Sequence, residues 1–132
     1  MREMTTFTSF EEIEAWQKAR DLTREIYRIS NEAPFSRDFG LCNQIRRACV
    51  SVMSNITEGF ERSGTKEFIQ FLSISKGSIG EVRSHLYIAF DQSYIDNDTF
   101  IDLVALATEI SRMISGLMNY LRKSHVRGSK YK

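Results

Sequence analysis

The stretch of sequence that decides the fold is Gln44–Phe60, which reads QIRRACVSVMSNITEGF. Apolar residues recur in it every three or four positions, and the series begins at Leu41, three positions before the stretch. Its members are Leu41, Ile45, Ala48, Cys49, Val52 and Ile56. Such spacing is typical of one face of an α-helix. The stretch therefore predicts a helix over about residues 41–61 with one buried side.

Beside this apolar face, helical geometry places a line of polar side chains: Gln44, Ser51, Asn55, Glu58 and Arg62, with Arg47 next to it. One interpretation is a binding site, in which the two arginines hold phosphate while Gln44 and Asn55 read a base edge or a sugar hydroxyl. The other is a hydrogen-bond network between helices or subunits, with Glu58 and Arg62 paired four residues apart. We favour the structural interpretation, because the carboxylate of Glu58 repels a phosphate backbone.

Three further segments show helical periodicity, over about residues 10–32, 66–92 and 99–123. Ser9 and Glu12 have the spacing of a capping box at the first start, and Pro34 follows the first end. Short connections between long helices force neighbours to be antiparallel. We predict one all-α domain over residues 1–132, an up-down antiparallel four-helix bundle, with a basic tail over residues 124–132 that frays from Gly128 onward.

The third predicted helix has small residues opposite its core stripe. The positions on this side are Ser73, Ile74, Gly77, Gly80, Ser84 and Ile88. Two glycines inside a helix cost about 1 kcal/mol each relative to alanine, so a gain elsewhere is expected. We predict that these six residues pack against a neighbouring subunit; the alternative is tolerated glycines among scattered surface isoleucines.

Composition limits the classes of protein. The chain has 132 residues, 42% of them hydrophobic, with one proline and seven glycines, which is typical of a helical globular domain. It has no apolar run of the ~20 residues that span a bilayer and no apolar N-terminal signal, so we expect a cytoplasmic protein without membrane contact. Cys42 and Cys49 lie on one apolar helix face, ~10 Å apart along its axis, and are interpreted as buried thiols beyond disulfide reach.

Charge is distributed unevenly along the sequence. Residues 1–109 hold 12 Lys and Arg against 17 Asp and Glu, whereas the residues beyond hold six basic and no acidic side chains. Arg122, Lys123 and Arg127 belong to this basic end, which is suited to phosphate backbones or an acidic partner, or to a solubilising helix end. A basic ridge is also predicted on the first helix, formed by Arg20, Arg24 and Arg28. Because Asp21 and Glu25 lie beside it, an ordinary solvated face is favoured over an RNA-binding surface.

Catalytic patterns are lacking. A di-iron bundle needs paired Glu-x-x-His motifs, and the nearest sequence is a single Glu81-x-x-x-His85. The glycines form no phosphate-binding loop, and Ser51 and Ser54 have no histidine at helical spacing to activate them. We therefore predict a protein that is not an enzyme, with no catalytic residue, metal, cofactor or small-molecule substrate.

Several stretches carry a family resemblance: Phe10–Ala19, Gln44–Ala48, Ser54–Gly59 and Lys66–Leu72. From about Phe10 to Tyr120 the chain resembles the bacterial four-helix-bundle proteins encoded in intervening sequences of large-subunit ribosomal RNA genes, a family similar to the accessory variability determinant of diversity-generating retroelements. Met53 stands where that family usually has proline, and Thr57 where it usually has alanine.

The resemblance implies a partner and an assembly. It suggests a non-catalytic accessory that binds RNA or an RNA–protein complex, and a homo-oligomer, specifically a pentamer, like the ring of the retroelement accessory protein. The candidate contact residues come from the polar line, the basic ridge and the basic end: Arg20, Arg24, Arg28, Gln44, Arg47, Asn55, Arg62, Arg122, Lys123 and Arg127. The alternative is a protein–protein adaptor or scaffold without a nucleic-acid role, and the charge on the exposed end of the assembly discriminates between the two.

Overall fold

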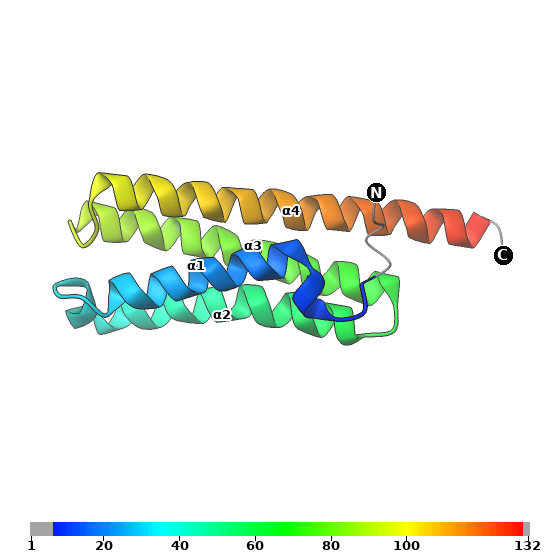
Figure 1. Cartoon of the computed structure of the whole chain (residues 1–132), viewed down its shortest axis with the longest axis horizontal. Helices are drawn as coiled ribbons and strands as arrows, with labels where there is room; N and C mark the ends of the chain where they lie inside the picture. The colour runs from blue at the N-terminus through cyan, green and yellow to red at the C-terminus, as the bar shows by residue number, and fades with distance from the viewer. Residues whose placement is uncertain (1–6, 131–132) are drawn as a thin grey trace.

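The computed structural model describes the backbone of residues 7–130 and the side chains of residues 7–124. The chain forms four long helices: α1 (Glu14–Ser30), α2 (Phe39–Glu61), α3 (Thr65–Asp91) and α4 (Asn97–Lys130). Two short 3-10 turns, η2 (Phe10–Glu12) and η3 (Phe35–Arg37), precede α1 and α2. Figure 1 shows the helices lying lengthwise beside one another, each connected to the next by a tight turn.

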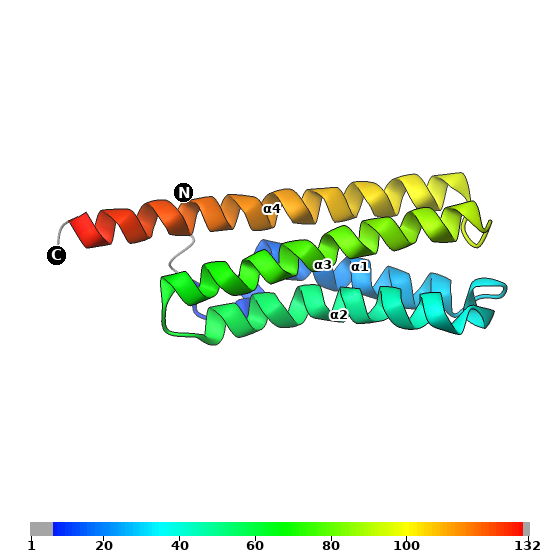
Figure 2. The ribbon, with the colours of Figure 1, turned by 180° about the vertical axis from the view of Figure 1, so that it is seen from behind.

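Each helix packs against two others, so the four enclose a single core. α2 lies between α1 and α3, and α4 lies between α3 and α1 (Figures 1 and 2). The core contains fully buried isoleucines from every helix, among them Ile26, Ile45, Ile79 and Ile110. The whole apolar series of α2 is buried in it, from Leu41 to Ile56. The prediction of an all-α, up-down antiparallel four-helix bundle is confirmed.

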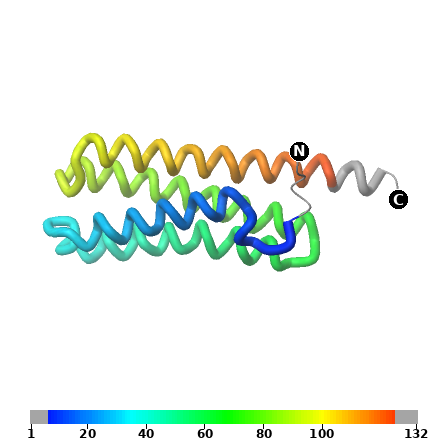
Figure 3. The backbone as a smooth tube through the Cα atoms, viewed as in Figure 1, coloured from blue at the N-terminus to red at the C-terminus, as the bar shows by residue number. Residues whose placement is uncertain are grey.

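The start of the first helix differs from the prediction of one helix over residues 10–32. The Glu12 carboxylate accepts the backbone N–H of Ser9 at 3.3 Å, as the capping-box spacing predicts. The chain then adopts extended backbone at Ile13, which is buried at 2% exposure, before α1 begins. Figure 3 shows the resulting bend. Burying Ile13 favours the break, and Phe10 packs edge-on against Trp16 across it, with ring centroids 5.1 Å apart.

The turns at one end of the bundle are tied to each other. Asp38 caps α2 by accepting the backbone N–H of Leu41 at 3.0 Å, and its other oxygen accepts the Tyr94 hydroxyl at 2.9 Å. Tyr94 lies between α3 and α4, and its ring stacks on buried Phe35. The hydrogen bond to Asp38 raises the pKa of Tyr94. This end of the bundle is therefore fixed by a cap that also joins two connections.

The fourth helix is longer than expected. It begins at Asn97 and continues to Lys130, whereas the predicted span was 99–123. Asp96 accepts the backbone N–H of Thr99 at 2.8 Å and caps the start. The sequence after Lys123 holds no proline, and one glycine in a helix costs only about 1 kcal/mol, so the helix continues. The helix thus extends past its predicted end at residue 123 and includes the predicted basic tail up to Lys130; residues 131–132 lie outside the described residues.

Candidate nucleic-acid interface

The interface between α2 and α3 is closed by hydroxyl and amide side chains. The Ser51 and Ser78 hydroxyl oxygens lie 2.7 Å apart and share a hydrogen bond across the two helices. Asn55 donates to the Ser51 backbone oxygen at 2.8 Å and to its hydroxyl at 3.0 Å. Ser75, fully buried, donates to the Val52 backbone oxygen at 2.8 Å. We call this surface the α2/α3 interface. Asn55 supports this contact from within α2, through its two hydrogen bonds to Ser51.

Glycine allows the same two helices to approach closely at the other end of this interface. Gly59 is buried, and a Cβ added there would lie 2.8 Å from Phe68 Cδ1 and 2.9 Å from Phe71 Cβ. It would also lie 3.3 Å from the Phe68 backbone oxygen. These distances are shorter than van der Waals contact, so only a residue without a side chain fits.

Gln44 and Arg47 line an open cleft that extends to the Ser51–Ser78 contact. Both are exposed and line a hollow of about 450 Å³ between α2 and α3, together with Asn43 and Glu81. Arg47 forms no ion pair with another described residue. The carboxylate of Glu81 in the same cleft lowers its attraction for phosphate. The cleft is therefore polar and mixed in charge.

Arg62 is engaged within the chain. It donates to the Glu58 carboxylate at 2.8 Å, which is the pair expected four residues apart on a helix. A second carboxylate, on Glu67, lies 3.8 Å away, and the guanidinium sits 5.2 Å from the centre of the Phe71 ring. Two carboxylates around one guanidinium leave little net positive charge at this position.

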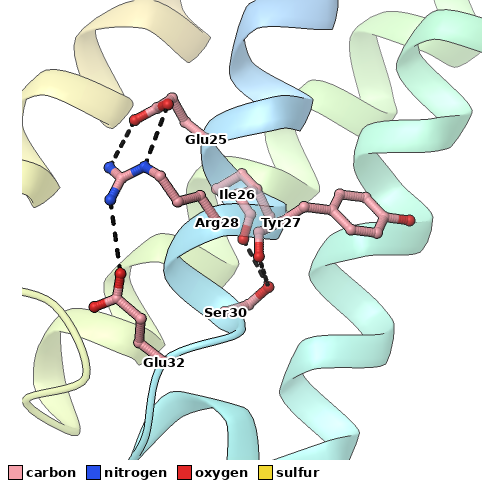
Figure 4. A network of polar contacts seen from close by, with 6 residues as sticks. All are labelled: Glu25, Ile26, Tyr27, Arg28, Ser30 and Glu32. Atoms are coloured by element: carbon pink, nitrogen blue, oxygen red, sulfur yellow. Dashed lines mark hydrogen bonds and ion pairs between the residues drawn. The ribbon is translucent and has the colours of Figure 1, made fainter.

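The ridge of Arg20, Arg24 and Arg28 on α1 is exposed but largely neutralised. Arg28 donates to Glu25 at 2.7 Å and lies 3.7 Å from Glu32, as Figure 4 shows. The hydrogen bond with Arg28 lowers the pKa of Glu25 and keeps this carboxyl charged. Arg24 lies 3.8 Å from Asp21. Of the three cations, Arg20 alone forms no ion pair with a described residue, so the ridge is close to the solvated face that the neighbouring acids suggested.

The small residues of α3 face outward. We call the surface formed by Ser73, Ile74, Gly77, Gly80, Ser84 and Ile88 the α3 outer face; all six are exposed. Ile74 is 53% and Ile88 43% exposed. A Cβ added at Gly77 or Gly80 would meet no atom within 4 Å, so packing within the bundle does not require glycine at either position.

The last of the predicted contact residues lie near the end of α4. Arg122 and Lys123 are exposed, and Arg122 donates to the Asn119 side chain at 3.3 Å. Arg127 is in the last turns of α4, and its side chain lies outside the described residues. The fold therefore does not bring the predicted contact residues into one site. They lie on α1, in the cleft beside α2, at the C-terminal end of α2 and near the C-terminal end of α4.

A basic surface that sequence reasoning missed lies between α3 and α4. Lys76 and Arg83 on α3 face Arg112 on α4 across a hollow of about 450 Å³. Its other lining residues are Thr108, Ser111, Ser115, Gly116 and Asn119. We call this surface the α3/α4 groove. The only signal in the sequence was the line of Ser111, Ser115 and Asn119 at four-residue spacing after the last acidic residue.

Both cysteine thiols lie inside the bundle. Cys42 and Cys49 are free and buried, as predicted, and burial raises the pKa of Cys49 to about 12. Cys42 donates to the Phe35 backbone oxygen at 3.2 Å. Within the described residues, no three His, Cys, Asp or Glu side chains gather where they could hold a metal ion. None of the helices in that part of the chain is long and apolar enough to cross a membrane.

The architecture places the chain in the class of all-α, antiparallel four-helix-bundle proteins. Residues 11–116 match the 23S rRNA-intervening sequence proteins, and the chain belongs to that family. This confirms the resemblance seen in the sequence.

One solved structure with this fold is the crystal structure of a protein with unknown function from the S23 ribosomal protein family of Bacteroides thetaiotaomicron VPI-5482. The two chains are 20% identical, and the superposition has a TM-score of 0.73 and covers 80% of this chain and 95% of the other. At that identity the likeness concerns the fold alone. No curated protein matches the sequence.

Proposed function

We propose that the chain is a non-catalytic, homo-oligomeric bundle protein that serves as an accessory to RNA or to an RNA–protein complex. The observation that carries the proposal is the α3 outer face, which combines two exposed isoleucines with two glycines that the bundle itself does not need. A helix surface of this kind suits the close approach of another helix. The proposal assigns that approach to a second copy of the chain, and the pentamer follows from the family resemblance.

The case for RNA rests on family membership and on charge. The family is described by its association with intervening sequences of 23S rRNA. Within the chain, the six Lys and Arg residues after Glu109 have no acidic residue among them, and five of the six lie on α4. If several copies assemble with α4 in the same orientation, these charges add and attract a polyanion. Arg122 and Lys123 are the exposed candidates at that end.

A protein adaptor is the second candidate function, and one observation favours it. Residues 1–109 carry five more acidic than basic side chains, and the arginines at positions 24, 28 and 62 are already paired with carboxylates. A body of this net charge opposes the binding of a polyanion. An adaptor would use the same assembly and bind a protein at its end face.

The assembly is tested by the mass of the protein in solution. Sedimentation velocity at micromolar concentration is expected to give a multiple of the 15.3 kDa chain mass. Replacing Gly80 by Gln places a side chain on the α3 outer face without a clash inside the bundle, and should lower that mass. The matched control is Gly116→Gln on α4, a site that is equally open within the bundle. A wild-type protein that sediments as a monomer contradicts the assembly.

The RNA partner is tested in the native cytoplasm. Ultraviolet crosslinking, purification under denaturing conditions and sequencing of the attached RNA should give a defined transcript or ribosomal segment. Crosslinked peptides should map to α4 and not to the α1 ridge, where Arg24 and Arg28 are paired with carboxylates. Recovery of no RNA above a mock purification rejects the accessory role in favour of the adaptor.

A further inference from the structure

The α3/α4 groove is a concentration of cations without acids. Three positively charged side chains line it, Lys76, Arg83 and Arg112, and its remaining lining carries hydroxyl and amide groups. The carboxylates on the neighbouring turns are directed elsewhere: Glu81 lines the α2 side of α3, and Glu109 pairs with Lys18 of α1 at 3.4 Å. The groove is therefore uniformly positive, in contrast to the mixed cleft on the other side of α3.

Its cations are not used within the chain. None of Lys76, Arg83 and Arg112 forms a hydrogen bond or an ion pair with another described residue, whereas the arginines at positions 24, 28 and 62 all do. Arg83 is half-buried, and its Nε is buried without any hydrogen-bond partner. A buried donor without an acceptor is costly, so this guanidinium is poorly satisfied by the bundle alone.

The neutral residues of the groove add free donors and access. The hydroxyls of Ser111 and Ser115 form no hydrogen bond with described residues, and Ser111, Ser115 and Asn119 stand one helical turn apart. Gly116 lies beside them, and a Cβ there would meet no atom within 4 Å. Packing within the bundle does not require glycine at this position. Because Gly116 has no side chain, however, the groove is open to an extended ligand.

The spacing of the charges indicates a polyanion instead of a single phosphate. Lys76 and Arg83 stand seven residues apart, ~10 Å along α3. At one end of the groove Arg122 is hydrogen-bonded to the lining residue Asn119, which extends the positive surface toward the end of α4. No aromatic side chain lines the groove, so contacts would be made to the sugar–phosphate backbone without stacking on bases.

We propose that the α3/α4 groove, through Lys76, Arg83 and Arg112, is the site where the protein binds the phosphate backbone of RNA, independently of sequence. This inference rests on the proposed RNA role and names the surface that performs it. The α1 ridge and the cleft beside Gln44 are then not the principal contact surfaces, because Arg24 and Arg28 are paired with carboxylates and Arg47 shares its cleft with Glu81.

The test measures binding of the full-length protein to a fluorescein-labelled single-stranded RNA of mixed sequence over a range of salt concentrations. The triple variant Lys76→Gln, Arg83→Gln, Arg112→Gln removes three groove charges. The logarithm of its binding constant should depend on the logarithm of salt concentration with a slope shallower by about 2, and its affinity at low salt should fall roughly tenfold or more. The matched control, Arg20→Gln, Arg24→Gln, Arg28→Gln, removes the same charge from α1 and should keep the wild-type slope.

Two further arms separate failure of this inference from failure of the proposed function. Because Arg83 is half-buried, the double variant Lys76→Gln, Arg112→Gln, whose two positions are exposed, tests the groove without altering the core; a slope change of about 1.4 is expected. If the wild-type protein binds RNA and the double variant has the same salt-dependence slope, the groove is rejected as the binding site while the proposed RNA role stands. Wild-type protein that binds no RNA, or that prefers polyglutamate at equal charge concentration, overturns both.

Discussion

The two sides of helix α3 differ in how their polar side chains are used. On the side toward α2, the hydroxyls of Ser75 and Ser78 each form a hydrogen bond across the interface. On the side toward α4, Lys76 and Arg83 have no partner among the described residues. Both sides are rich in small and polar residues, so their compositions look alike in the sequence. The difference is whether the polar groups have hydrogen-bond or ion-pair partners within the chain. Polar groups that find partners within the chain hold two helices together, whereas those without partners remain available to a ligand.

The two sides of α3 differ most in how they tolerate a side chain at a glycine position. Gly59→Ala forces a Cβ against Phe68 and Phe71 in the α2/α3 interface, and should lower the free energy of unfolding by about 2 kcal/mol. Gly116→Ala in the α3/α4 groove meets no atom, and should raise it by about 1 kcal/mol through helix propensity. Urea denaturation of both variants measures the two values. Equal effects would mean that the two sides of α3 are packed alike.

The other closed side of α2, toward α1, has a consequence for pH. Burial raises the pKa of Cys49 from an ordinary value of 9.0 to about 12. Above pH 9 the unfolded chain therefore loses a proton that the folded chain keeps, so stability is full below pH 9 and falls as the pH rises toward 12. From pH 9 to pH 10 this group should remove about 1 kcal/mol, approaching 1.4 kcal/mol per pH unit above that.

The measurement is denaturation at pH 8, 9 and 10 with Cys49→Ala as the reference. The variant loses the thiol, so the difference between the two proteins isolates its titration from that of tyrosines and lysines. A difference that stays constant from pH 8 to pH 10 would show that Cys49 is accessible in the folded protein and that this side of α2 is open.

Asn55 distinguishes the two interpretations of the polar line. Its amide donates to both the hydroxyl and the backbone oxygen of Ser51, which in turn bonds Ser78. Asn55→Ala should lower the free energy of unfolding by about 1 kcal/mol, because these hydrogen bonds are lost from a half-buried site. RNA affinity of the folded variant, measured by fluorescence anisotropy, should stay at the wild-type value. Loss of affinity at unchanged stability would favour a binding role for Asn55.

Ser78 and Ser115 lie on opposite sides of α3, and only Ser78 has a hydrogen-bond partner among the described residues. Ser78→Ala and Ser115→Ala gain the same helix propensity, but only the former loses a hydrogen bond, the 2.7 Å contact with Ser51. The net change should be a loss of about 0.5 kcal/mol for Ser78→Ala and a gain of about 0.5 kcal/mol for Ser115→Ala. Thermal melting of both proteins side by side is sensitive enough to determine the two signs. A loss at Ser115 would reveal an intramolecular partner in the groove.

Much of the fold follows from local sequence signals. The apolar series Leu41–Ile56 and the breaks at Ser63–Thr65 and Asp96 set the lengths and directions of the last three helices, because a periodic face can be buried in only one way. The bend at Ile13 was missed since an apolar residue next to a capping box normally continues a helix. Here burial of one side chain outweighs that local preference.

The candidate site was harder to predict because it is assembled from two helices. Lys76 and Arg83 are separated from Arg112 by a turn and a change of direction, so each reads as an ordinary solvated charge. Their convergence depends on the antiparallel register of α3 and α4. The ridge on α1 is the opposite case, since Arg20, Arg24 and Arg28 are visible at regular spacing, yet neighbouring acids on the same helix neutralise two of them.

The smallest expected effect concerns the paired charges at the end of α2. Glu58→Gln removes the carboxylate that Arg62 contacts at 2.8 Å, but both side chains are about half exposed and Glu67 remains 3.8 Å from the same guanidinium. Exposed ion pairs of this kind contribute at most a few tenths of a kcal/mol, so urea denaturation should barely change. The variant frees positive charge at Arg62, and RNA affinity should rise slightly if binding is electrostatic. An increase as large as the loss in the groove variants would place the main RNA contact at this end of α2 instead of between α3 and α4.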